Sequence, residues 1–252
     1  MKHKIKDIGI IYRIINYGDS SLILNVYCRE IGNIAILAKA MRTKSNNGNV
    51  SVLNEYEFIV YEPSEPGLYL MAEYSLIHEV AYNSSAESMA TASCGLELVS
   101  SMLIGHDEHI MYYDLLKKYL AYLEQVPKGK IALFWRFAVR VFQFQGIDIN
   151  LAACNCCRKA GKVISGVDLN IGNPLCEECL RGSVMEPHRY QLEPSTVHIL
   201  NILPSIGNHL DSIHINKQNV IDMDTILKAY YEHHFQKSFK LRSLNVLEQF
   251  YN

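Results

Sequence analysis

The sequence lacks the short motifs by which most enzymes bind a nucleotide or position a nucleophile. Its 252 residues contain no G-x4-G-K-[ST] phosphate loop, no G-x-G-x-x-G turn, no H-E-x-x-H helix and no G-x-S-x-G elbow. The ten histidines are scattered, and only His233 and His234 are adjacent. Adjacent side chains on a helix point about 100° apart, so these two cannot share a metal ion as an i,i+4 pair does. We therefore expect a protein that is not an enzyme.

Little in the sequence suggests export or insertion into a membrane. Residues 1–7 include three lysines and lack the apolar core of a signal peptide. The run that comes closest to a membrane span, 194–210, contains Pro204 and two asparagines. We therefore expect a cytoplasmic protein whose cysteines are reduced.

The net charge is also small, at −2, and by itself predicts no affinity for nucleic acid. The charge is unevenly distributed, however. Residues 1–49 carry eight Lys or Arg against three Asp or Glu (net +5), residues 50–126 carry two against twelve (net −10), and residues 127–252 carry fourteen against eleven (net +3). Because electrostatic fields act within a Debye length of about 8–10 Å, the basic end matters more for binding than the net charge.

Four of the seven cysteines form the pattern C-x2-C-x18-C-x2-C: Cys154, Cys157, Cys176 and Cys179. Two such hooks about twenty residues apart have the spacing of a four-thiolate zinc site, and the segment between them is long enough for a short hairpin. A disulfide pair would suit a secreted chain, whereas reduced cysteines favour a metal. Because four protein sulfurs fill the coordination sphere, we expect a structural Zn2+ ion and not a catalytic one.

The other three cysteines have different surroundings. Cys156 lies inside the first hook and could replace a neighbour as a ligand, although only the 154/157 pair keeps the two-residue gap. Cys28 and Cys94 lie in apolar stretches, and we expect them to be packed core thiols.

Hydrophobic periodicity divides the chain into a β part and a helical part. β-branched or alternating runs bounded by turn residues predict five strands, which suggest a small barrel or sandwich: 8–15, 21–27, 34–38, 56–61 and 68–77. Apolar residues at three- and four-residue intervals then predict helices: 86–103, 112–123, 131–142, 195–203 and a last helix that starts near Asp222 or Asp224. The first helix has a capping box at 84–87 and ends its apolar face at Leu103. Pro204 breaks the fourth, and the tail, 243–251, is weakly helical.

Several short motifs, in one order along the chain with the four cysteines, resemble the signature of the bacterial RecO family of recombination mediators. These motifs are 9–11, 16–24, 29–32, 38–42, 137–140, 145–147, 233–235 and 242–247. Each is soft by itself, but their common order is specific and covers most of the chain. Ala40 departs from the pattern, because the family usually has glycine there.

The resemblance implies an α+β multidomain protein with an N-terminal OB-fold β-barrel at 1–80, an α-helical domain at 81–150 and 184–252, and an inserted four-cysteine zinc ribbon at 151–183. It implies a non-enzymatic mediator, cytoplasmic and nucleoid-associated, that binds single- and double-stranded DNA and anneals complementary strands. Members of the family work with RecR and help to load RecA onto DNA coated with single-strand-binding protein. The alternative is a zinc-ribbon interaction or transcription-associated module that reaches DNA only through partners.

An OB barrel binds a strand through a basic groove and aromatic stacking, which is worth about 1–3 kcal/mol per stacked base. Five basic side chains in and near one inter-strand loop are candidates for binding DNA: Lys39, Arg42, Lys44, Arg13 and Arg29. We expect the first two to contact phosphates; the alternative is a solvated loop. Three tyrosines are candidates for stacking: Tyr12, Tyr17 and Tyr27. Their alternative is the core or rim of the barrel.

One helix also carries a candidate partner site. Arg136 and Arg140 lie one turn apart, near Trp135, Phe142 and Phe144. The tail of single-strand-binding protein is acidic and ends in an aromatic residue, so its receptor needs cationic groups beside an apolar pocket. The alternative is an ordinary amphipathic helix with solvated or acid-paired arginines.

Overall fold

The computed structural model describes residues 3–43, 46–47, 50–81, 85–147, 153–159, 161–182 and 188–251. Contacts divide the chain into two compact units, Met1–Gln125 and Val126–Asn252. Along the described ranges, no helix is long and apolar enough to cross a membrane. The three-part division drawn from the sequence stays a prediction.

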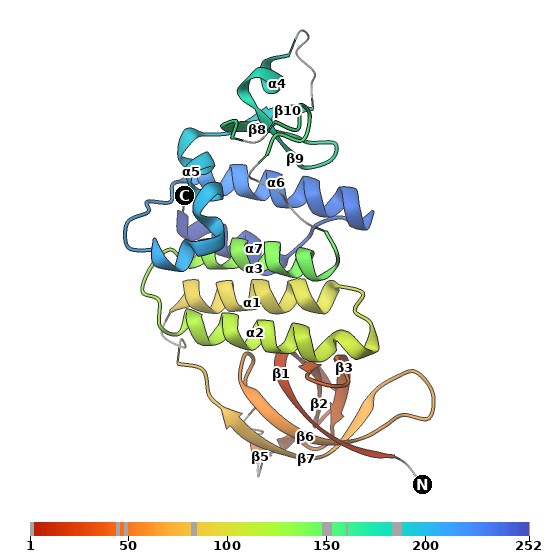
Figure 1. The fold of residues 1–252 in the computed structure, drawn as a ribbon. Helices are drawn as coiled ribbons and strands as arrows, with labels where there is room; N and C mark the ends of the chain where they lie inside the picture. The colour runs from red at the N-terminus through yellow and green to blue at the C-terminus, as the bar shows by residue number, and fades with distance from the viewer. Residues whose placement is uncertain are drawn as a thin grey trace. The chain divides into compact units, whose positions relative to one another are not determined.

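The first unit begins with a closed barrel in the strand order β1-β2-β3-β7-β6 (Figure 1). Its strands are β1 (Lys4–Tyr17), β2 (Ser21–Cys28), β3 (Asn33–Ala38), β6 (Glu55–Tyr61) and β7 (Tyr69–His78). Neighbouring strands pair antiparallel, except that β3 and β7 are parallel. Two-residue strands, β4 (Arg42–Thr43) and β5 (Asn46–Asn47), pair separately. All five predicted strands are present, and the barrel is OB-like, as predicted.

Alternation of side chains places one face of each strand inside the barrel. On β2, Leu22, Leu24 and Val26 are buried, as the sequence pattern predicts. Gly9 on β1 permits a close approach, since a Cβ there would lie 2.5 Å from Val26 Cγ1. The 9–11 motif therefore has a packing role in the barrel.

Two helices complete the first unit: α1 (Ala86–Ser101) and α2 (His109–Leu123), joined through the 3-10 helix η1 (His106–Glu108). The N-cap of α1 is Ser85, whose side chain accepts a hydrogen bond from the Ser88 N–H. The predicted capping box starts at Ser84, which lies outside the described residues. The α2 helix is attached to the barrel through Glu55 of β6, which is buried and accepts from Tyr113 OH (2.6 Å).

The apolar period of α1 continues in the sequence beyond the end of the helix. Met102 adopts an extended conformation (φ −75°, ψ 149°) and ends α1. The prediction that the helix and its apolar face extend to Leu103 is therefore wrong, and the Leu103 side chain is 79% exposed. Periodicity missed this end because the first helix-stopping residue in the sequence, Gly105, comes three residues later.

The second unit contains α3 (Lys130–Phe144), α5 (Pro194–Ile202), α6 (Lys217–Phe235) and α7 (Arg242–Leu247), with 3-10 segments η2 (Leu203–Asn208) and η3 (Glu248–Tyr251). α5 ends just before Pro204, as predicted. The predicted start of α6 near Asp222 or Asp224 is wrong, because Asn216 caps a helix that begins at Lys217. The first turn of α6 is polar, so the apolar period gave no signal there.

The 145–147 motif ends α3. Gly146 has a φ of +74°, and its N–H donates to Gln143 O (2.9 Å). The Ile147 N–H donates to Phe142 O (3.1 Å). These two bonds form a Schellman motif, which requires a left-handed residue and so favours glycine.

A small sheet in the order β10-β8-β9 and a short helix carry the cysteines. The elements are β8 (Ile164–Asp168), β9 (Asn173–Cys176), α4 (Glu177–Arg181) and β10 (Arg189–Gln191). Strands β8 and β9 form the predicted hairpin. The sheet is held against α6, since Tyr190 OH donates to Asp222 Oδ1 (2.8 Å) and a Cβ at Gly172 would lie 2.7 Å from the Tyr230 backbone.

Candidate metal centre and nucleic-acid interface

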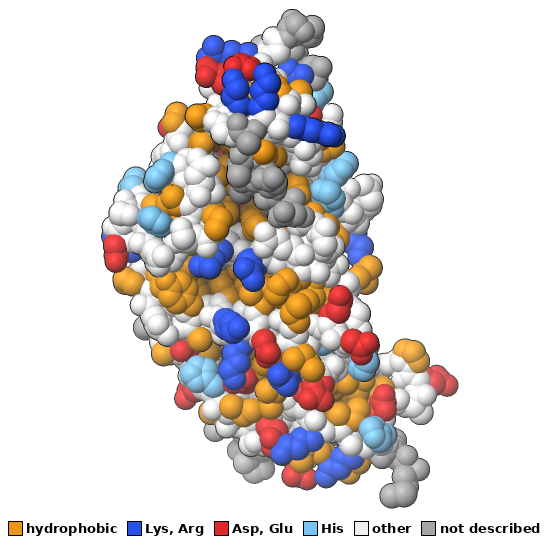
Figure 2. Space-filling view, viewed as in Figure 1, with side chains coloured by type: hydrophobic (Ala, Val, Ile, Leu, Met, Phe, Trp, Pro, Cys, Tyr) orange, Lys and Arg blue, Asp and Glu red, His pale blue; other side chains and the backbone are white. Residues whose placement is uncertain are grey.

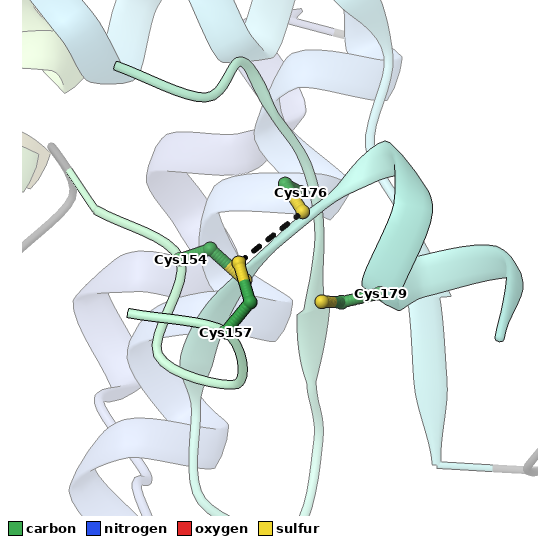
Figure 3. A group of neighbouring side chains, drawn as sticks. All are labelled: Cys154, Cys157, Cys176 and Cys179. Atoms are coloured by element: carbon green, nitrogen blue, oxygen red, sulfur yellow. Dashed lines mark hydrogen bonds between the residues drawn. The ribbon is translucent and has the colours of Figure 1, made fainter. Parts of the chain in front are cut away.

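Four cysteine sulfurs from the two hooks come together in the second unit (Figure 3). The Sγ atoms of Cys154, Cys157, Cys176 and Cys179 all lie within 4.8 Å of one another, and those of Cys157 and Cys176 are 3.9 Å apart. A tetrahedral ion with Zn–S bonds of about 2.3 Å separates its sulfurs by about 3.8 Å. The predicted cluster is therefore present, with the dimensions of a metal site.

Local backbone structure places each hook. In the first, the Arg158 N–H donates to Cys154 O (2.9 Å) and closes the turn. In the second, Cys176 is the N-cap of α4, so Cys179 lies in the first turn of that helix. The turn directs the two sulfurs of the first hook, and the start of α4 directs the two sulfurs of the second, toward the same centre. In both hooks a gap of two residues is enough to bring the paired sulfurs together.

The thiols have different proton affinities. Burial acts to raise the pKa of Cys154, but backbone N–H groups of its neighbours in the cluster lower it, to about 6 overall. Burial and then the neighbouring thiols raise the pKa of Cys179. Because like charges repel, four sulfurs this close cannot all be thiolates unless a cation lies among them. The donor set therefore fits a divalent ion with an affinity for thiolate.

The remaining cysteines are not members of this group of four sulfurs. Among the described residues, the group of clustered ligand atoms comprises only the four sulfurs, and Cys156 is exposed beside it. Cys28 and Cys94 are fully buried, as predicted. Burial, with a smaller effect of Asp7, raises the pKa of Cys28.

At one end of the barrel, the β1–β2 turn lies next to the loop that follows β3. The Arg42 N–H donates to Ser20 O (2.8 Å), and Arg42 Nη1 donates to Gly18 O (3.2 Å). Lys39 is exposed on the same loop, and Tyr17, the last residue of β1, is 51% exposed. This end therefore presents two cations and an accessible ring; Lys44, the third predicted cation of the loop, lies outside the described residues.

The other basic side chains of the N-terminal segment fall into two groups. Lys4 and Lys6 pair with Glu73 and Glu57 across the sheet (3.3 and 3.0 Å). Arg29 pairs with Asp114 at the opposite end of the β1–β2 hairpin (3.3 Å). In contrast, no ion pair within the described part of the chain involves Arg13, Lys39 or Arg42, and all three are exposed.

The three tyrosines differ in exposure. Tyr27 is 1% exposed and packs against His109 of α2, on the face of β2 opposite Val26; burial raises its pKa. Tyr12 is half-buried, and its OH donates to Asn33 Oδ1 (2.7 Å). Only Tyr17 of the three presents a largely exposed ring.

Sequence reasoning missed the carboxylate that shapes the 29–32 motif. Asp7 on β1 is buried and accepts from the N–H groups of Ile8 (2.7 Å), Glu30 (3.0 Å) and Ile31 (3.0 Å). The same turn needs Gly32, whose φ is +75° and whose Cβ would collide with the His109 ring. No local signal could have shown that Asp7 holds this turn, because Glu30 and Ile31 are more than twenty residues away in sequence.

On α3, the two predicted partner-binding arginines are accessible, but most of the aromatic side chains near them are not. Arg136 is half-buried and Arg140 is exposed. Trp135 and Phe142 are fully buried. Phe144 is the aromatic residue beside Arg140, with its ring centroid 5.9 Å from the guanidinium carbon.

The fold and site define a multidomain α+β protein in which an OB-like barrel precedes a helical region with a four-cysteine cluster. Two family models match it in that order: Recombination protein O N terminal over residues 1–80, and Recombination protein O C terminal over residues 83–244. The chain belongs to the recombination protein O (RecO) family, as its motifs predict.

Relatives named DNA repair protein RecO align with both units. The protein of Halalkalibacterium halodurans is 24% identical over 257 aligned residues, covering 99% of this chain and 95% of that protein. That of Exiguobacterium sibiricum is 24% identical over 250 residues (97% and 96%). That of Caldicellulosiruptor saccharolyticus is 26% identical over 243 residues (94% and 96%). The similarity therefore extends along the barrel, the helices and the cysteine hooks.

Proposed function

We propose that this chain is a non-enzymatic mediator of recombinational DNA repair that binds single- and double-stranded DNA and anneals complementary strands. In this proposal it assists RecR in loading RecA onto DNA coated with single-strand-binding protein, in the cytoplasm at the nucleoid. Membership of the RecO family supports the role in repair. The basic end of the OB-like barrel is the observation that supports direct binding of DNA.

The proposed DNA interface comprises Arg13, Lys39 and Arg42 as phosphate contacts and Tyr17 as a stacking platform. The three cations are exposed and, among the described residues, none pairs with a carboxylate, so a phosphate would not have to compete with an acidic side chain. The Arg42–Gly18 bond holds the loop beside the turn that carries the ring. Lys44 extends the proposed interface along the chain, and Arg29 is its weakest member because it is paired with Asp114.

The interface is tested by reversing two charges, in Lys39→Glu with Arg42→Glu. Fluorescence anisotropy of a labelled oligothymidylate is measured from about 50 to 200 mM salt. We expect affinity to fall at least about tenfold and the salt slope to shrink by about 1.4, since each single-strand phosphate contact contributes about 0.7. The same variant should anneal complementary oligonucleotides coated with single-strand-binding protein more slowly.

Lys237→Glu with Lys240→Glu is the matched control, because both lysines are exposed in the second unit and the change in net charge is the same. If both double variants bind the strand as the unaltered protein does, the barrel interface is wrong. The strand would then bind elsewhere on the chain. If the unaltered protein itself does not bind the strand, the chain reaches DNA only through partners.

The four-cysteine cluster is proposed to hold one structural Zn2+ ion. The d electrons of Zn2+ impose no preferred geometry, so the ion accepts a tetrahedron of four thiolates. Four sulfur ligands leave no open coordination position for a substrate. The ion would fix the two hooks and, through the hairpin, the contacts with α6 at Asp222 and Tyr230.

Arg136 and Arg140 remain the proposed receptor for the acidic tail of single-strand-binding protein. Phe144 beside Arg140 offers an apolar contact, whereas the buried Trp135 offers none. Arg140→Glu should therefore weaken binding of a synthetic tail peptide, measured by anisotropy, while leaving oligothymidylate binding unchanged.

A further inference from the structure

The connection between α1 and α2 bounds a groove in the first unit that is lined by both apolar and polar groups. The groove has a volume of about 390 Å3, and its apolar lining is Ile31, Val99, Met102, Leu103 and Ile104. This volume lies within the range of about 300–1,000 Å3 typical of ligand pockets. Asn33 and His109 add polar groups to the lining.

Leu103 stands at this groove with 79% of its surface exposed, and two further apolar side chains follow His109 on α2. Ile110 and Met111 are each 40% exposed. A single exposed leucine needs no explanation. Leu103, however, stands at the edge of a cavity, which is typical of a surface that another molecule covers; Ile110 and Met111 are outside the lining of that cavity.

Negative charge surrounds the groove. Asp107 and Glu108 on η1 are exposed, as is Glu30 beside the lining residue Ile31. Glu108 Oε2 accepts from the N–H of Gly105, which holds that carboxylate at the rim (3.1 Å). The neighbouring cation, Arg29, is already paired with Asp114. In Figure 2, acidic and histidine side chains lie beside apolar surface at the right-hand edge, over the α1–α2 connection of Figure 1.

The groove and the basic loop lie at opposite ends of the same strands. Asn33, in the groove lining, begins β3, and Lys39 directly follows its last residue, Ala38. At about 3.3 Å per residue, the strand separates the two ends by roughly 17 Å. A phosphate backbone is attracted to one end and repelled by the other, so the ligand of the groove is not DNA.

We propose that this groove binds a segment of a partner protein in which a bulky apolar side chain is flanked by Lys or Arg. The apolar side chain enters the cavity beside Leu103, and the cations face the rim carboxylates. This surface is separate from the proposed DNA interface, so the partner and a DNA strand can be bound together.

The test selects peptides from a random twelve-residue display library on the full-length protein and measures their synthetic copies by anisotropy. We expect the selected sequences to combine Lys or Arg with Leu, Ile, Phe or Met. Leu103→Ser should weaken their binding at least fivefold, and Asp107→Lys should weaken it more at low salt than at high salt. Leu76→Ser is the matched control, because Leu76 is 51% exposed on β7 and does not line the groove.

Selection of acidic peptides, of none, or of peptides that bind Leu103→Ser as tightly as the unaltered protein would overturn the proposal. Sedimentation velocity distinguishes one other occupant. If the chain self-associates and Leu103→Ser abolishes that association, the groove is an interface between copies of the chain, and the proposal is wrong. Oligothymidylate affinity should be the same in all four proteins.

Discussion

At the scale of single residues, the loop proposed to bind DNA contains a strained position. Ala40 has a φ of +54°, in the left-handed region where a Cβ is unfavourable and glycine is not. Its side chain is exposed, so burial does not offset the strain. The resemblance to the family predicts glycine at this position, and glycine would adopt this backbone conformation without strain.

Ala40→Gly should therefore stabilise the protein by about 1 kcal/mol, because removing the Cβ relieves a left-handed residue. For a protein of this size the gain corresponds to a Tm about 2–4 °C higher. Thermal unfolding followed by circular dichroism measures it. Ala35→Gly is the control, since Ala35 lies within β3 and glycine in a strand costs stability. Equal losses in both variants would contradict the strain at Ala40.

Residues whose partners are near in sequence were predictable, and those with distant partners were not. The four cysteines were found because each hook is a local pattern and only one hairpin joins them. Asp222 was seen only as a helix start, yet it is fully buried and accepts from Tyr190 OH, the Glu193 N–H and Thr196 Oγ1. Those partners come from elements that only folding brings to α6.

At the scale of elements, apolar periodicity predicted the interiors of strands and helices better than their ends. All five barrel strands were predicted from β-branched or apolar runs bounded by turn residues; buried side chains alternate along β2 and β6 but not along β7. The end of α1 and the start of α6 were missed, since Met102 leaves the helix without a glycine or proline and α6 opens with polar residues. The available signal for the start of α6 was Asn216, because asparagine is a favoured N-cap residue.

A pair of carboxyl groups joins α6 to the C-terminal segment η3. Asp224 Oδ1 is buried and, among the described residues, has no hydrogen-bond partner. Burial, and then the neighbouring Glu248 carboxyl, raises the pKa of Asp224 to about 9. The folded state therefore holds a proton that the unfolded chain releases near its ordinary value of 3.8. Because the folded state binds more protons between these values, this pair makes the protein less stable as pH rises.

Asp224→Asn should raise Tm at pH 8 and have a smaller effect at pH 5, because the amide cannot lose a proton on unfolding. Thermal unfolding at several pH values measures the difference. Asp211→Asn serves as the control, since the Asp211 side chain is 94% exposed. A gain in stability that does not change with pH would show that the pair does not share a proton.

At the scale of the whole molecule, the uneven charge of the sequence is partly neutralised by the barrel. β1 pairs with β6, and β6 pairs with β7, so Lys6 of the basic end meets Glu57 on β6 and Lys4 meets Glu73 on β7, both in the acidic segment. The composition alone could not show this, because charge counts along a chain carry no information on strand pairing. Within the described part of the chain, the fold leaves Arg13, Lys39 and Arg42 of the basic end without acidic partners, and these are the cations proposed to bind DNA.

The two compact units predict separate responses to loss of metal. Removal of the proposed zinc, by chelation or in Cys176→Ser, should loosen β8 and β9 and the part of α6 around Asp222 and Tyr230, because the hairpin holds both. Amide hydrogens there should exchange at least about tenfold faster, which corresponds to a loss of about 1.4 kcal/mol in the free energy of local opening. Exchange in β1 and β2 should not change. Oligothymidylate binding should stay within twofold, since the proposed interface lies in the other unit.

Cys156→Ser should keep one zinc per chain and normal exchange, because Cys156 lies outside the sulfur group. Loss of zinc from Cys156→Ser would instead make that thiol a ligand, and loss of protection in the barrel would show that the two units unfold together.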